Sequence, residues 1–274
     1  MVTCYSCHRG GQHPKAIPSL AEQYSTPPPD DPNEVAIIPQ APAGNSADQI
    51  LDKYIEAVGG AQRLDSLKSF AGKGTYVGYD TDFMKVPADV FAKAPDERTT
   101  IAHERFGDAT VAYDGRAGWI AGPDKPVPVL ALPAGPDLDG LKLDADLSFP
   151  GNIKQALSQW RTGFPPTEID GHPVEVIQGT TAAKSRVNLY FDKSSGLLLR
   201  SVRFTETIVG IVPTQVDYSE YRDVAGVKLP FHWTVTWTSG RSTFEMSEIQ
   251  PNVAIDSMRF GKPAPVAPAG SDGR

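Results

Sequence analysis

The chain has 274 residues, of which 40% are hydrophobic, and a formal net charge of −7. This negative charge disfavours nucleic acid as a partner, because neutralising phosphate groups requires a basic face. No stretch approaches the roughly eighteen consecutive apolar residues that a membrane-spanning helix needs, so no such span is predicted.

The N-terminal segment carries both cysteines of the chain, Cys4 and Cys7, in a Cys-Tyr-Ser-Cys-His run that ends at His8. A C-x-x-C-H run is typical of the attachment of a c-type haem. The two thiolates add to the haem vinyl groups, and the adjacent imidazole ligates the iron. We therefore predict a covalent haem c, with Cys4, Cys7 and His8 binding the cofactor and His8 as the metal ligand.

Three other interpretations of this motif stay open. A redox C-x-x-C is expected at a helix start within a βαβ pattern, which does not follow here. A structural zinc site needs further Cys or His ligands at a set spacing, and a plain disulfide does not need His8. For the second axial ligand, His13 is the nearest candidate, whereas Met84 and Met246 are expected to fill the core. We expect that ligand in sequence upstream of this chain.

The motif begins three residues after Met1, so no signal peptide precedes it in this sequence. Haem of the c type is attached outside the cytoplasm, and export requires such a signal. We therefore expect the sequence to be the C-terminal part of a longer exported protein. The expected location is the periplasm or the outer face of a bacterial membrane.

A proline-rich segment follows the motif, with eight of the 25 prolines between Pro14 and Pro42. Such a segment tends to extended polyproline II and acts as a semi-rigid spacer. The Pro/Ala/Gly-rich C-terminal end is expected to be disordered. The predicted organisation is a haem-binding segment at 1–20, a linker at 21–45, a folded domain at 46–262 and a tail at 263–274.

Two helices are predicted at the start of the folded domain. Ser46 and Gln49 form a capping-box pattern, after which apolar residues recur at helical spacing. The Gly59-Gly60 pair ends this helix, and a second short one covers 61–67. A further helix is predicted within the sheet region, where Ile153, Leu157 and Trp160 are spaced for a single face.

From Phe70 onward the hydrophobic period changes to two, which predicts antiparallel strands. The predicted strand and hairpin segments are 111–113 with 119–120 around Asp114-Gly115, 187–191 before a turn at 192–196, and 233–237 with 244–246 around 239–241. The predicted fold class is mainly β with a few helices (α+β). A long curved antiparallel sheet would form a half-barrel around the helices, because a sheet of this length must curl to bury its apolar face.

Other patterns do not predict a catalytic or metal site. Gly72 to Gly78 opens a strand rather than a helix, so it lacks the helix N-terminus that a phosphate cradle requires. The acidic residues from Asp137 to Asp146 lack the spacing of a calcium loop and are interpreted as a solvated acidic loop leading to a helix. His103, His172 and His232 are scattered, with no metal-binding pair spacing among them. No enzyme activity is predicted.

Two resemblances add to these patterns. The first residues, including Cys4, Cys7 and His8, resemble the last haem-binding segment of the cytochrome c subunit of photosynthetic reaction centres. The remainder, with Ile50 to Tyr54, Gly59-Gly60 and the 72–78 strand, is similar to the outer-membrane lipoprotein-carrier fold. The combination resembles a bacterial family in which a reaction-centre-type cytochrome region precedes such a domain, and this implies electron transfer.

The resulting functional prediction is electron transfer by a covalent haem, with a redox protein as partner, including a membrane-associated one. The half-barrel is assigned to docking or to holding an apolar ligand in its concavity. Trp233 and Trp237 are candidate lining residues, although a packed core is the preferred interpretation for both. The alternative is a periplasmic lipid or lipoprotein carrier with a vestigial haem motif. A cell-envelope scaffold with neither activity is the third hypothesis.

Overall fold

The structure is a computed structural model, and it describes residues 44–123, 127–207, 210–238 and 240–265. Its α-helices are α3 (Ala47–Ala57), α4 (Ala61–Ser66), α5 (Pro136–Leu147) and α6 (Ile153–Ala156), and its 3-10 helices are η1 (Tyr79–Thr81), η2 (Pro150–Asn152) and η3 (Ser257–Arg259). The strands are β1 (Ser69–Gly78), β2 (Val86–Lys93), β3 (Glu97–Glu104), β4 (Gly107–Asp114), β5 (Gly118–Ala121), β6 (Val129–Leu132), β7 (Ser158–Arg161), β8 (Thr167–Ile169), β9 (His172–Thr180), β10 (Arg186–Asp192), β11 (Leu198–Thr207), β12 (Gly210–Val224), β13 (Val227–Trp237) and β14 (Gly240–Pro251).

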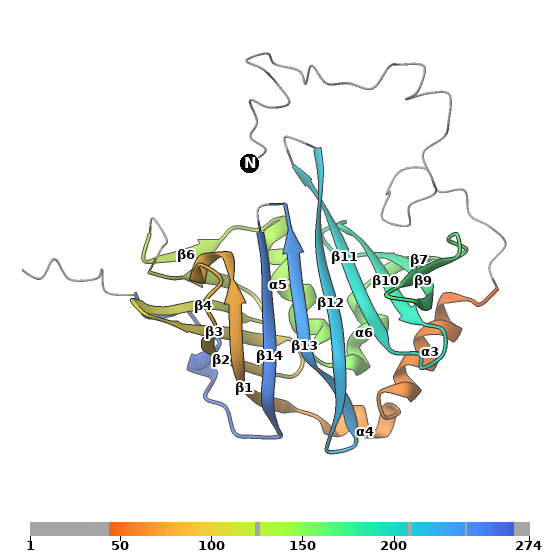
Figure 1. The fold of residues 1–274 in the computed structure, drawn as a ribbon, viewed down its shortest axis with the longest axis horizontal. Helices are drawn as coiled ribbons and strands as arrows, with labels where there is room; N and C mark the ends of the chain where they lie inside the picture. The colour runs from red at the N-terminus through yellow and green to blue at the C-terminus, as the bar shows by residue number, and fades with distance from the viewer. Residues whose placement is uncertain (1–43, 124–126, 208–209, 239, 266–274) are drawn as a thin grey trace, which may run out of the picture.

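These 14 described strands form one antiparallel sheet in the order β6-β5-β4-β3-β2-β1-β14-β13-β12-β11-β10-β9-β7, with β8 paired to β9. Strand β1 joins the two halves, because it pairs with β2 on one side and with the last strand, β14, on the other. The sheet curves but does not close, since its two end strands, β6 and β7, are not neighbours. The predicted mainly β fold with a curved antiparallel sheet is confirmed (Figure 1).

Helix α5 lies within the curve of the sheet. It contacts β3 and β4 from one half and β11 from the other, and Figure 1 draws it behind β13 and β14. A sheet buries its apolar face by packing against another layer. The concave face therefore holds the helices, as the half-barrel prediction required.

The predicted N-terminal helix forms as its capping pattern indicates. The amide of Gln49 donates to Ser46 Oγ at 3.3 Å, and the amide of Ser46 donates to Gln49 Oε1 at 2.9 Å. Gly59 ends the helix with a φ of 136°, in close approach to the carbonyl oxygen of Gly226. The helix start and end predicted from the sequence are both confirmed.

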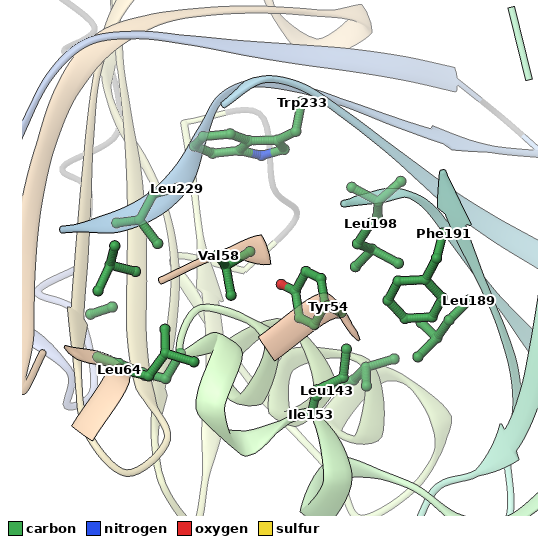
Figure 2. Close-up of a cluster of buried hydrophobic side chains, with 14 of the residues drawn as sticks. Tyr54, Val58, Leu64, Leu143, Ile153, Leu189, Phe191, Leu198, Leu229 and Trp233 are labelled. Carbon is green, nitrogen blue, oxygen red and sulfur yellow. The ribbon is translucent and has the colours of Figure 1, made fainter. Parts of the chain in front are cut away.

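The core lies between α3, α5, α6 and the concave face of β9–β14. Leu51, Val58 and Ile153 are fully buried there, and the rings of Tyr54 and Phe191 meet at 5.4 Å between centroids. Figure 2 shows Tyr54, Val58, Ile153 and Phe191 among the side chains that converge between the helices and the sheet. Burying side chains of this size contributes about 1.5–3 kcal/mol each, so this region stabilises the domain.

Two helix predictions need correction. The helix predicted through Ile153, Leu157 and Trp160 covers only Ile153–Ala156, and Trp160 lies in β7. The segment interpreted as a solvated acidic loop is helix α5, and Asp139 and Asp146 within it are buried. Asp139 accepts a hydrogen bond from Thr181, and Asp146 accepts one from Lys142. These partners make the burial of the two carboxylates possible.

Candidate functional site

Small residues face the concave side in the half of the sheet away from the packed core. Ala102 of β3 lies opposite Ala88 of β2 and Ala109 of β4. Directly opposed residues in an antiparallel sheet point to the same face, so these three alanines form one row. Gly72 belongs to the same face, opposite Val90. Side chains this small do not reach across the curve of the sheet, and space remains.

This space is a hollow of about 450 Å³ between β1–β5, β12–β14 and α5. Its apolar lining residues are Phe70, Tyr76, Val90, Ala102, Ala109, Val111, Ala112, Tyr113, Ile120, Ala121, Leu141, Leu147, Val216, Tyr218, Leu229, Pro230, Trp233, Val235, Phe244, Met246 and Ile249. Ligand sites in proteins span about 300–1,000 Å³ and are mostly apolar with a few placed polar groups. The hollow has both properties.

One face of α5 supplies the helical wall of the hollow. Leu141, Asp144 and Ser148 lie three and four residues apart, a spacing that places them on one side of a helix. The hydroxyl of Ser148 donates to the backbone carbonyl of Asp144 at 2.8 Å. Both polar residues therefore stand at the C-terminal end of α5, facing the sheet.

Arg98 of β3 enters the hollow from the opposite wall. Its Nη1 atom donates to Ser148 Oγ at 2.6 Å, and its guanidinium carbon lies 5.7 Å from the ring centroid of Trp233. Burial lowers the pKa of Arg98, while Asp144 and Tyr218 act in the opposite direction. An arginine remains charged in such a site because its ordinary pKa lies so far above neutrality.

Asp144 faces Arg98 without touching it. Its carboxylate keeps accessible surface on the side of the hollow. Within the part of the chain that the structure describes, that carboxylate makes neither a hydrogen bond nor an ion pair at 4 Å or less. Burial raises the pKa of Asp144, while Arg98 and Arg203 lower it. The hollow thus contains a cation and an acid, both with unused hydrogen-bonding capacity.

The structure places both tryptophans that the sequence offered as candidate lining residues. Trp233 lines the hollow and stacks on Phe244 at 5.0 Å between ring centroids. Trp237 does not line it. Met246 is buried, as predicted for core filler, and also contributes to the wall of the hollow, whereas Met84 is exposed.

The predicted haem site lies outside the described residues. Cys4, Cys7, His8 and the candidate ligand His13 all fall in residues 1–43. Covalent haem at these positions stays an untested prediction. Most of the predicted linker and residues 266–274 of the predicted tail lie outside the described residues as well.

Residues missed in the sequence are the ones that give the hollow its polarity. The sequence pattern does not single out Arg98, and it places Asp144 in a solvated loop. A helical spacing of Leu141, Asp144 and Ser148 is present in the sequence, but its apolar content is too low to stand out. Only the curvature of the sheet brings residue 98 opposite this helix face.

Comparison with solved structures identifies the fold. A LolA superfamily protein from Nitrosomonas europaea aligns with a TM-score of 0.51 at 14% identity, covering 80% of this chain and 99% of that one. The fold is LolA-like. A putative outer membrane lipoprotein-sorting protein domain from Vibrio parahaemolyticus aligns with a TM-score of 0.51 at 12% identity, covering 77% of this chain and 97% of its own.

A DUF1329 family protein from Desulfovibrio piger aligns equally well, with a TM-score of 0.51 at 11% identity, covering 78% of this chain and 96% of that one. No protein-family profile matches the sequence, and no curated protein matches it either. The likeness therefore rests on the fold alone.

The reaction-centre cytochrome interpretation is corrected by these findings. The matching structures are LolA-like and lipoprotein-sorting proteins, and nothing among them supports electron transport, haem or iron. The described residues contain no group of three or more His, Cys, Asp or Glu side chains that could hold a metal ion.

No helix in the described part of the chain is both long and apolar enough to cross a membrane.

Proposed function

We propose that this domain binds the apolar chain of a lipid or lipidated molecule in the hollow on the concave face and carries it through an aqueous compartment. One observation supports this most strongly: a hollow of about 450 Å³ with a mostly apolar lining occupies the interior of a LolA-like fold. Apolar surface gains free energy on leaving water at about 25 cal/mol per Å². An acyl chain would therefore enter this space in preference to water.

The fold likeness supports a carrier more than a catalyst. One similar structure is described as an outer membrane lipoprotein-sorting protein domain. For this chain, we propose a periplasmic or outer-surface location and a ligand supplied by a membrane. Among the charged residues of the hollow, Arg98 and Asp144 do not touch, and we assign them to ligand recognition rather than to bond breaking.

Binding of a neutral apolar probe tests this proposal. N-phenylnaphthylamine, whose fluorescence rises in apolar surroundings, should bind the full-length protein saturably with one site per chain. Val111 faces the hollow opposite Ile120, so Val111→Trp should fill part of the space and weaken probe binding by about tenfold or more, equivalent to about 1.4 kcal/mol.

The matched control places the same indole on the other face of the sheet. Thr75 of β1 lies between two residues of the concave face, Gly74 and Tyr76, and pairs with Glu245 on the outer side. Thr75→Trp should leave probe affinity unchanged. The proposal fails if the two variants, both folded by circular dichroism, bind the probe equally well. Mass spectrometry of acyl compounds that copurify with the protein provides an independent readout.

A further inference from the structure

Three charged side chains line the hollow, and two of them have hydrogen-bonding groups that no described protein group satisfies. Asp80 accepts a hydrogen bond from the hydroxyl of Tyr76 at 2.7 Å. Arg98 uses one of its donors on Ser148, although a guanidinium offers five. The carboxylate of Asp144 has no hydrogen-bond partner among the residues described.

Polar groups that face an apolar wall rather than bulk water are normally hydrogen-bonded to protein, water or ligand, because leaving them unpaired is unfavourable. The free donors of half-buried Arg98 and the free carboxylate of Asp144, which keeps an exposed surface, open on the same hollow. A molecule in the hollow could therefore accept a hydrogen bond from Arg98 and donate one to Asp144. Water can fill such a gap in the empty protein, and a ligand with matching groups can replace it.

Resting on the proposed function, we infer that the hollow selects amphiphiles with a small, uncharged head that both donates and accepts hydrogen bonds, such as the glycerol head of a monoacylglycerol. The head would lie between Arg98 and Asp144. Arg98 would donate to a hydroxyl or ester carbonyl oxygen, and Asp144 would accept from a hydroxyl group. The acyl chain would occupy the apolar remainder of the hollow.

The charges of the site favour an uncharged head. An anionic head would be attracted by Arg98 but repelled by Asp144 and by Asp80. A cationic head would be attracted by the acids but repelled by Arg98. A zwitterionic head would match both signs, but taking two further charges out of water is far less favourable than taking out an uncharged head. A hydroxyl group satisfies both side chains without this desolvation cost.

The test is displacement of N-phenylnaphthylamine from the full-length protein by ligands that share one chain length and differ in the head. The ligands are monolauroylglycerol, laurate, dodecylamine, lauroyl lysophosphatidylethanolamine and dodecane, measured at about pH 8, well above the ordinary carboxyl pKa. Monolauroylglycerol should bind at least about tenfold more tightly than each of the others, which is the effect of one or two retained hydrogen bonds.

Two charge-removing variants sharpen the test. Asp144→Asn should tighten laurate binding relative to the unaltered protein, because the repelling charge is gone and Arg98 remains. Arg98→Met should tighten dodecylamine binding instead, because the repelling cation is gone and Asp144 remains. Lys85→Met, which removes an exposed cation paired with Glu245 outside the hollow, should leave the order of affinities unchanged. Each variant removes one charge and tests the charge that remains. If one variant does not fold, the other still tests the inference.

Two outcomes separate the two proposals. If all five ligands displace the probe with affinities that do not depend on the head, or if a charged head binds most tightly, the head-group inference is overturned and the proposed function stands. If neither the probe nor any chain-bearing ligand binds, the proposed function itself is wrong.

Discussion

Arg98 of β3 donates a hydrogen bond to Ser148 at the end of α5, with 2.6 Å between Nη1 and Oγ. This bond crosses the concave face and connects the sheet to the helix that walls the hollow. A hydrogen bond to a charged group is stronger than one between neutral groups. The contact therefore fixes both the arginine and the end of the helix.

Ser148→Ala removes this acceptor and is expected to destabilise the domain by about 1–3 kcal/mol, because a partly buried guanidinium loses its hydrogen bond. Urea unfolding monitored by tryptophan fluorescence measures the change. Ser66→Ala provides the control, since Ser66 Oγ bonds only the exposed carbonyl of Arg63. Equal effects of the two substitutions would contradict a special role for the Ser148 contact.

Leu51→Ala is expected to lower the free energy of unfolding by about 2–5 kcal/mol, because Leu51 on α3 is fully buried and the deletion leaves a cavity. Glu56 on the exposed side of the same helix is the control position, and Glu56→Ala should change stability little. Thermal and urea unfolding both report the difference. A small effect of Leu51→Ala would show that α3 contributes less to the core than its burial indicates.

Asp144→Asn is expected to raise the melting temperature at neutral pH. Burial raises the pKa of Asp144 in the folded state. The protonated side chain therefore stabilises the fold fully at pH values below the pKa of the unfolded state. This stabilisation is lost as the pH rises through the folded-state pKa. The asparagine keeps the neutral form at every pH. The gain should therefore shrink as pH falls toward about 4, and a gain independent of pH would count against this explanation.

His103, on the exposed surface, is expected to make a second pH-dependent contribution to stability. Burial lowers its pKa, but hydrogen bonds to Asp108 at 2.8 Å and Asp89 at 3.1 Å outweigh this and raise it. The protonated form is thus stabilising below about pH 6.5, and this contribution is lost as pH rises through the raised folded-state pKa.

His103→Gln should remove that pH-dependent contribution, which is expected to stay below about 1 kcal/mol because the pair is solvent-exposed. Urea unfolding at pH values on both sides of neutrality, together with the ¹H chemical shifts of the imidazole, measures it. His172→Gln serves as the control at an exposed histidine. An imidazole that titrates below its ordinary range would refute the prediction.

The elements set by local chemistry were predictable from the sequence. The helix after Ser46 has a cap, an apolar face and a glycine end within a dozen residues, and the hairpin containing Trp233 has strict alternation around a short turn. Helix α5 has neither strong apolar periodicity nor a side-chain cap: it begins at Pro136 after Gly135 and contains four acidic residues. Its helical form depends on burial of Asp139 and Asp146 against partners supplied by distant segments.

The mainly β class, the first two helices and an apolar concave face can be predicted from the sequence, because they follow from hydrophobic period, caps and turn residues within short windows. The hollow on that face, with Arg98 and Asp144 on its walls, is visible only in the folded structure. Consecutive hairpins align the small residues of β1–β4 on one face, and the pairing of β1 with the distant β14 joins this half of the sheet to the other half around α5. Such placement depends on long-range register and curvature, which no local pattern encodes.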